Sequence, residues 1–99
     1  MRILLVEDEK KLASFIEKGL QQEGYNVSVS HSGSTALEMA ASHKFDLILL
    51  DIMIPGQNGF EVLKSLREFS IETPIIFISA LNESEHIVKG LDLGAVDYI

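Results

Sequence analysis

Short apolar runs alternate with longer amphipathic stretches along this chain. Three runs are almost continuously apolar, which is typical of strands buried on both faces: residues 2–6, 45–51 and 75–79. Residues 26–30 alternate polar and apolar positions, and this pattern predicts a strand with one open face at a sheet edge. Residues 96–99 begin a fifth strand that the chain does not complete.

Between these runs, apolar residues recur at helical spacing. The first helix ends at Gly24, the third runs from about Gly59 to Phe69, and the fourth opens at Asn82 with a capping-box variant. The four predicted inward faces consist of Leu12, Phe15, Ile16, Gly19 and Leu20; of Ala36, Leu37, Ala40 and Ala41; of Val62, Leu63, Leu66 and Phe69; and of Ile87, Val88 and Leu91.

Alternating strands and helices predict an α/β fold, with a parallel sheet covered by helices on both faces. Right-handed crossovers and a flavodoxin-like strand order 2-1-3-4-5 make residues 2–6 and 46–50 neighbours in that sheet. The carboxyl ends of these two strands carry Glu7 with Asp8, and Asp51. The predicted topology therefore brings three carboxylates together at one sheet edge, where open α/β sheets bind ligands.

Three converging carboxylates repel one another and need a counter-charge if all are ionised. Mg²⁺ suits them because it prefers oxygen ligands, and no His or Cys lies near these acids in sequence to favour zinc. Two simpler interpretations stay open: Asp51 as a helix-capping residue, and Glu7, Asp8 and Glu9 as first-turn acids that complement a helix dipole. We prefer the dipole interpretation for Glu9 alone.

A carboxylate beside Mg²⁺ can act as a nucleophile on phosphorus, which gives an aspartyl phosphate at Asp51. Two further residues are expected on strands that end at the same edge of the predicted sheet. Ser79 offers a hydroxyl for a phosphoryl oxygen, or is a simple turn serine. Tyr98 lies on the fifth strand, where it is otherwise a partly buried sheet aromatic.

Length and charge narrow the function classes. The 99 residues suffice for one domain, 1–99, and no apolar run approaches the roughly 18 residues of a membrane span. The N-terminal apolar run is too short for a signal peptide and there is no Cys, so we expect a cytoplasmic protein. The net charge of −7 and the scattered basic residues argue against direct nucleic-acid binding.

Four segments together resemble the receiver domain of bacterial two-component response regulators, in the branch whose full-length members carry a winged-helix DNA-binding domain. These segments are Val6-Glu7-Asp8-Glu9, the stretch from Leu49 to Gly59 with its Pro-Gly and Asn-Gly turns, Ile78-Ser79-Ala80, and the stretch from Gly90 to Ile99. The resemblance covers all 99 residues. It implies a CheY-like variant of the flavodoxin-like fold, with the fifth strand incomplete and the fifth helix absent.

The resemblance also implies residue roles. Asp51 corresponds to the phosphoacceptor, and Asp8, Asp51 and the Met53 carbonyl to the magnesium ligands, with Glu7 acting through water. Ser79 corresponds to the switch hydroxyl and Tyr98 to the switch aromatic. The implied phosphodonor is a histidine kinase, and the implied output is DNA binding by an effector domain outside this chain. Such a domain is a phosphoacceptor that promotes its own phosphorylation, not a turnover enzyme.

The C-terminal end departs from the family pattern. The family has a lysine a few residues after the switch aromatic, whereas this sequence ends one residue after Tyr98. We interpret the chain as a truncated receiver, in which phosphorylation at Asp51 is weakened. An apolar sheet face left uncovered by the fifth helix should lower stability or drive self-association, for example as a homodimer.

Three alternatives to a receiver are a phosphatase, an association module and a flavodoxin. A magnesium-dependent phosphatase of the haloacid-dehalogenase type has a second Asp two residues after its nucleophile, where this chain has Met53. A receiver-like module that serves only for association is favoured by the missing lysine but not by the acidic trio. A flavodoxin shares the fold alone, and its phosphate cradle should not be acidic.

Overall fold

A computed structural model of the chain describes residues 1–55, 58–78 and 97–98. Its elements are β1 (Arg2–Val6), α1 (Lys10–Gln22), β2 (Asn26–Ser30), α2 (Gly33–Ser42), β3 (Leu47–Asp51), α3 (Gly59–Glu68), β4 (Ile75–Ile78) and β5 (Asp97–Tyr98). The strands form one parallel sheet in the order β2-β1-β3-β4-β5. The predicted strand order is confirmed.

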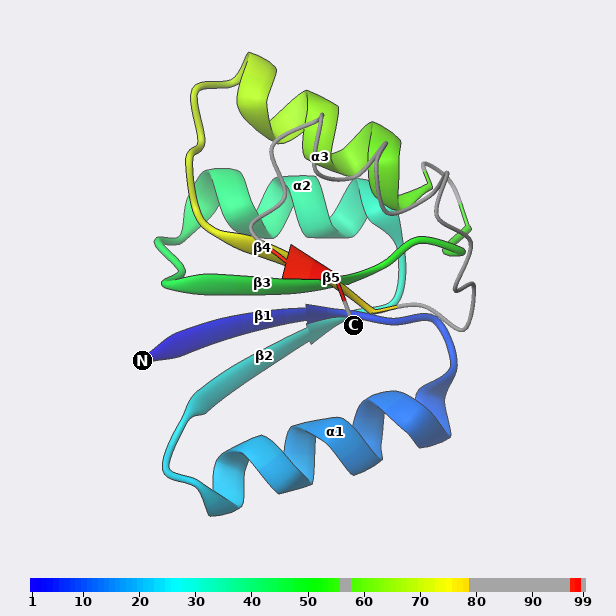
Figure 1. Ribbon diagram of the computed structural model, residues 1–99, viewed down its shortest axis with the longest axis vertical. Coiled ribbons are helices and arrows are strands. Elements are labelled where there is room, and N and C mark those ends of the chain that lie inside the picture. The colour runs from blue at the N-terminus through cyan, green and yellow to red at the C-terminus, as the bar shows by residue number, and fades with distance from the viewer. Residues whose placement is uncertain (56–57, 79–96, 99) are drawn as a thin grey trace.

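Helices lie on both faces of the sheet (Figure 1). One face is covered by α1, and the other by α2 and α3. In the sheet, β1 lies beside β3 with Val6 opposite Leu50, so the residues that follow these two positions leave the sheet at the same edge. This register places Glu7 level with Asp51.

The side of the sheet under α2 and α3 holds the larger hydrophobic core. Alternate strand residues point into it, among them Leu4, Leu50 and Phe77, all of which are fully buried. The ring of Phe60 on α3 meets the edge of the Phe77 ring, with centroids 5.2 Å apart. This packing holds α3 against β4, the strand that pairs with β3 and lies beside Asp51.

The side under α1 is packed more thinly, and the predicted inward face of this helix was partly wrong. Ala13 is buried and Ile16 and Leu20 are half-buried against the sheet, but Leu12, Gly19 and Phe15 are exposed, Phe15 to 76%. The contacting stripe therefore keeps Ile16 and Leu20 of the predicted face and adds Ala13. Two further predicted inward residues are exposed: Ala41 on α2, and Phe69 just after α3.

Within the described part of the chain, Leu47, Ile76 and Ile78 on the α1 side of the sheet are only half-buried. A poorly covered apolar face, and self-association through it, stay predictions. Among the helices in the described part of the chain, none has the length and apolar content to cross a membrane.

Two predicted features lie outside the described residues: Ser79 and the helix predicted to open at Asn82. The predicted fifth strand is present as β5, in which Tyr98 pairs with Phe77 of β4.

Candidate functional site

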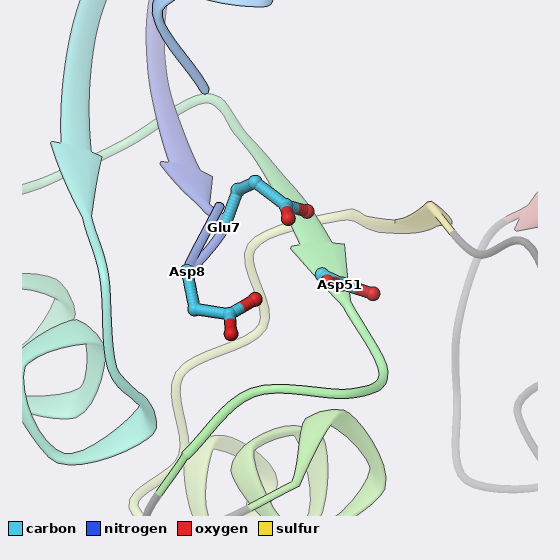
Figure 2. A group of neighbouring side chains, drawn as sticks. All are labelled: Glu7, Asp8 and Asp51. Carbon is cyan, nitrogen blue, oxygen red and sulfur yellow. The ribbon is translucent and has the colours of Figure 1, made fainter. Parts of the chain in front are cut away.

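Three acidic side chains meet at the carboxyl edge of the sheet. Glu7 and Asp8 follow β1, Asp51 is the last residue of β3, and one carboxylate oxygen from each lies within 4.8 Å of the others. Figure 2 shows the Glu7 side chain reaching from the end of β1 across toward Asp51. The convergence predicted from the strand order is therefore present, and the oxygen-only donor set suits a hard divalent cation.

The two acids that follow β1 differ in exposure. Glu7 continues the strand hydrogen bonding, because its backbone N–H donates to the Ser30 carbonyl of β2 at 3.0 Å. Its side chain is only 3% exposed, and its Oε1 accepts the Glu9 N–H at 3.3 Å. Asp8, the next residue, is exposed. The acidic cluster thus has one acid buried in the protein and one exposed to solvent.

Burial, together with the hydrogen bond and the negative charge of Asp51, raises the pKa of the Glu7 carboxyl from 4.5 to about 7. The Glu9 N–H opposes this change, and the charge of Asp8 adds to it. Without a cation, a proton on Glu7 is what lets two carboxylates lie together. A divalent cation would supply the same compensation and release that proton.

We expect the folded chain to become less stable as pH rises, because Glu7 then loses this proton. The pKa of Glu7 is higher when folded than unfolded, so its stabilising contribution is present below about pH 4.5 and is lost as pH rises through about 7. Without divalent cations, the unfolding free energy of the unsubstituted chain should fall between pH 5 and pH 8. The fall should be about 2 kcal/mol larger than for Glu7→Gln, which has no carboxyl group to titrate at this position. Urea unfolding at each pH measures this.

The exposed Glu9→Gln is the matched control and should leave the pH dependence unchanged, because Glu9 contacts Glu7 through its backbone. Parallel pH profiles for Glu7→Gln and the unsubstituted chain would contradict the assignment of a proton to Glu7.

The loop after Asp51 is anchored to the core by alternate residues. Ile52 and Ile54 are buried, whereas Met53 between them is 65% exposed. The Met53 N–H donates to Oδ1 of Asp51 at 3.2 Å, which holds one carboxylate oxygen in place. The loop is tied to α2 as well, since the Gly33 N–H donates to the Pro55 carbonyl at 3.4 Å.

Helix α3 begins directly against the backbone of Asp51, and Gly59 makes this approach possible. A Cβ at Gly59 would lie 2.7 Å from the Asp51 carbonyl oxygen and 2.7 Å from the Cα of Ile52. Asn58 caps the helix, with its side chain accepting the Glu61 N–H at 3.0 Å and Glu61 accepting the Asn58 N–H in return. Sequence reasoning missed this capping box, although Asn-Gly-Phe-Glu carries its spacing.

The structure brings some of the predicted site residues together and not others. Glu7, Asp8 and Asp51 form one cluster, and the Met53 backbone contacts it through its N–H. Tyr98 lies on β5, which β3 and β4 separate from β1, and Ser79 lies outside the described residues. Sequence reasoning also missed His31, whose ring Nδ1 lies 2.8 Å from the Glu7 carbonyl oxygen.

Comparison with known sequences gives a consistent picture. Residues 3–99 match the family described as response regulator receiver domain. The transcriptional regulatory protein DltR of Streptococcus agalactiae is 48% identical over 99 residues, which are 100% of this chain and 44% of DltR. The chain therefore spans less than half the length of the curated relatives that it matches.

Solved structures agree. The receiver domain of the Francisella response regulator 1452 has a TM-score of 0.95 and 36% identity, over 99% of this chain and 81% of that one. The response regulator TrrA of Thermotoga maritima, solved in complex with Mg²⁺-BeF, has a TM-score of 0.88 and 32% identity, over 99% of this chain and 84% of that one.

The fold, the acidic cluster and the sequence relatives all indicate the same family. Receiver domains are phosphoacceptor signalling domains and not turnover enzymes, so the phosphatase and flavodoxin alternatives fall away. The chain belongs to the response regulator receiver domain family of two-component systems, and its relatives are transcriptional regulators.

Proposed function

We propose that this receiver accepts a phosphoryl group on Asp51, with Mg²⁺ held by Asp8, Asp51 and the Met53 carbonyl. Glu7 acts on the metal through water. The observation that carries the proposal is the meeting of three carboxylates from two non-consecutive strands, with oxygen atoms within 4.8 Å of one another. Mg²⁺ favours such oxygen ligands and keeps several waters, which leaves room for a phosphoryl oxygen.

The chain's own residues define how the transfer proceeds. A carboxylate oxygen of Asp51 attacks phosphorus, the bond from phosphorus to the donor nitrogen breaks, and the departing imidazole takes up a proton. The Met53 N–H holds Oδ1 of Asp51, which fixes the plane of the attacking carboxylate. Bound Mg²⁺ supplies charge neutralisation to the transferring group.

Signal output follows from a change in conformation. Ser79 is the proposed hydroxyl that moves toward the phosphoryl group, and Tyr98 the aromatic that turns inward with it. The new contacts to the phosphoryl group favour one of two arrangements around the predicted fourth helix and β5. The pairing of Tyr98 with Phe77 places β5 beside β4, the strand that leads to Ser79.

The proposed donor is a histidine kinase, in the cytoplasm. The proposed output is transcriptional control through DNA binding by a further domain, as the names of the longer relatives suggest. The acidic receiver, with net charge −7, does not itself contact DNA in this proposal.

Labelling with a small phosphodonor tests the proposal. The chain is incubated with acetyl phosphate, with and without Mg²⁺, and mass spectrometry locates the added phosphoryl group. We expect labelling at Asp51 that requires Mg²⁺, and Mg²⁺ binding that saturates in a titration. A phosphoryl group on another residue, or labelling that is independent of Mg²⁺, would overturn the assignment.

The same experiment separates the receiver from a module that serves only for association. Such a module would bind Mg²⁺ weakly or not at all and would remain unlabelled at any donor concentration. Asp8→Asn is the informative variant, because it removes one metal ligand at the exposed rim and keeps the side-chain shape. It should weaken Mg²⁺ binding by about 10- to 100-fold.

A further inference from the structure

We propose that His31 is a positioning residue for the acidic pocket. Its ring holds the peptide group that joins Glu7 to Asp8 and so sets the direction from which Asp8 approaches a cation. The metal role of Asp8 in this inference rests on the proposed function. The contact itself does not, because it is made within the protein.

The contact is a hydrogen bond with a defined donor. The Nδ1 atom of His31 lies 2.8 Å from the Glu7 carbonyl oxygen. A carbonyl oxygen only accepts hydrogen bonds, so Nδ1 must carry the proton. In the neutral ring this leaves Nε2 without one. The geometry therefore specifies one tautomer of an exposed histidine.

The last residue of β2 and the residue that follows it hold the main chain of Glu7 from both ends. The Ser30 carbonyl accepts the Glu7 N–H at 3.0 Å, and the His31 ring donates to the Glu7 carbonyl. The first of these bonds continues the ladder between β1 and β2, but the second depends on a side chain. It fixes the plane of the peptide group from which Asp8 projects.

Asp8 needs such support because no strand positions it. β1 ends at Val6, and Asp8 is exposed between this end and the start of α1 at Lys10. Metal affinity depends on how well ligands are held before the cation arrives. A loop acid with a fixed backbone binds a cation with less loss of conformational freedom than a loose one.

The turn that carries His31 is itself anchored. Ser30 is 2% exposed, and its hydroxyl donates to the Ser32 carbonyl at 2.8 Å. Ser32 in turn caps α2, with its side chain accepting the Thr35 N–H at 3.3 Å. The histidine ring therefore extends from a fixed base, which distinguishes it from a freely rotating surface side chain.

Three variants test the proposal by Mg²⁺ titration. His31→Ala removes the donor, His31→Asn places an amide N–H near the position of Nδ1, and His43→Ala removes an exposed histidine that follows α2. We expect His31→Ala to weaken Mg²⁺ binding about 10-fold. His31→Asn should restore most of the lost affinity, and His43→Ala should leave it unchanged.

A second measurement separates positioning from general stability. Labelling of His31→Ala by acetyl phosphate should be slowed most at limiting Mg²⁺ and should recover towards saturating Mg²⁺, because the variant weakens how the cation is held. Unchanged Mg²⁺ affinity in His31→Ala, or equal weakening in His31→Ala and His31→Asn, would overturn the proposal.

Nitrogen-15 NMR of the imidazole tests the contact without any metal. We expect the neutral His31 ring to carry its proton on Nδ1, and a proton on Nε2 would overturn the proposal. Should the unsubstituted chain fail to bind Mg²⁺, the proposed function fails separately. The positioning role is then measured by the Asp8 amide shift, which should move in His31→Ala and return in His31→Asn; a shift that stays fixed would refute it.

Discussion

Replacing Asp51 with asparagine is expected to reduce labelling by acetyl phosphate to background. The amide cannot form the anhydride bond to phosphorus. Among the described residues, no other carboxylate lies at the end of β3. Glu7 lies beside Asp51 but is only 3% exposed, which makes it a poor nucleophile for a phosphodonor from solution. Mass spectrometry after incubation with the donor and Mg²⁺ measures the result.

Asp46→Asn is the matched control. Asp46 lies just before the opposite end of β3, where its Oδ2 accepts the Arg2 N–H at 2.7 Å. This variant changes the charge by the same amount outside the acidic pocket, so labelling should persist. Asp51→Asn that keeps its labelling would show that another residue accepts the phosphoryl group, and loss of labelling in Asp46→Asn would mean that the assay reports overall charge.

The strand order could be predicted because buried strands and helices alternate so regularly. An almost continuous apolar run such as residues 45–51 has few alternatives in a chain of this length, and right-handed crossovers then restrict the topology. Helix faces were harder to predict. Phe15 fits the helical spacing but is 76% exposed, since spacing alone does not show which side of a stripe the sheet contacts.

The acidic site was predicted through the topology and not through any local motif. Glu7 and Asp51 are far apart in sequence, and only the adjacency of β1 and β3 joins them. His31 escaped prediction because an exposed loop histidine carries no local signal for a contact with a backbone carbonyl. The order of burial, with Glu7 inside and Asp8 at the rim, also depends on tertiary packing.

Two segments outside β1 and β3 hold the loops that carry the acids. The end of β2 and the turn after it hold Glu7 through Ser30 and His31, and the start of α3 lies against the backbone of Asp51. The Gly59 N–H also donates to the Ile52 carbonyl at 2.8 Å. Changes in these supports should therefore alter the site without removing any proposed ligand.

Gly59→Ala is the strongest such change. The added Cβ would meet the Asp51 carbonyl oxygen and the Ile52 Cα, each at 2.7 Å, and backbone atoms cannot rotate away as a side chain can. Helix α3 and the end of β3 must separate, although α3 is held by buried Phe60 and Leu63. We expect a loss of about 3 kcal/mol in unfolding free energy, measured by urea denaturation.

Gly19→Ala separates this close approach from the general effect of adding a methyl group to a helical glycine. Gly19 lies in α1, is exposed, and has no atom within 4 Å of an added Cβ. The better helix propensity of alanine should therefore stabilise the chain by about 0.5 to 1 kcal/mol. Opposite signs for the two variants are the expected signature, together with slower labelling of Asp51 in Gly59→Ala alone. If Gly59→Ala were as stable as Gly19→Ala, the contact between α3 and the backbone of Asp51 could not be what positions the phosphoacceptor.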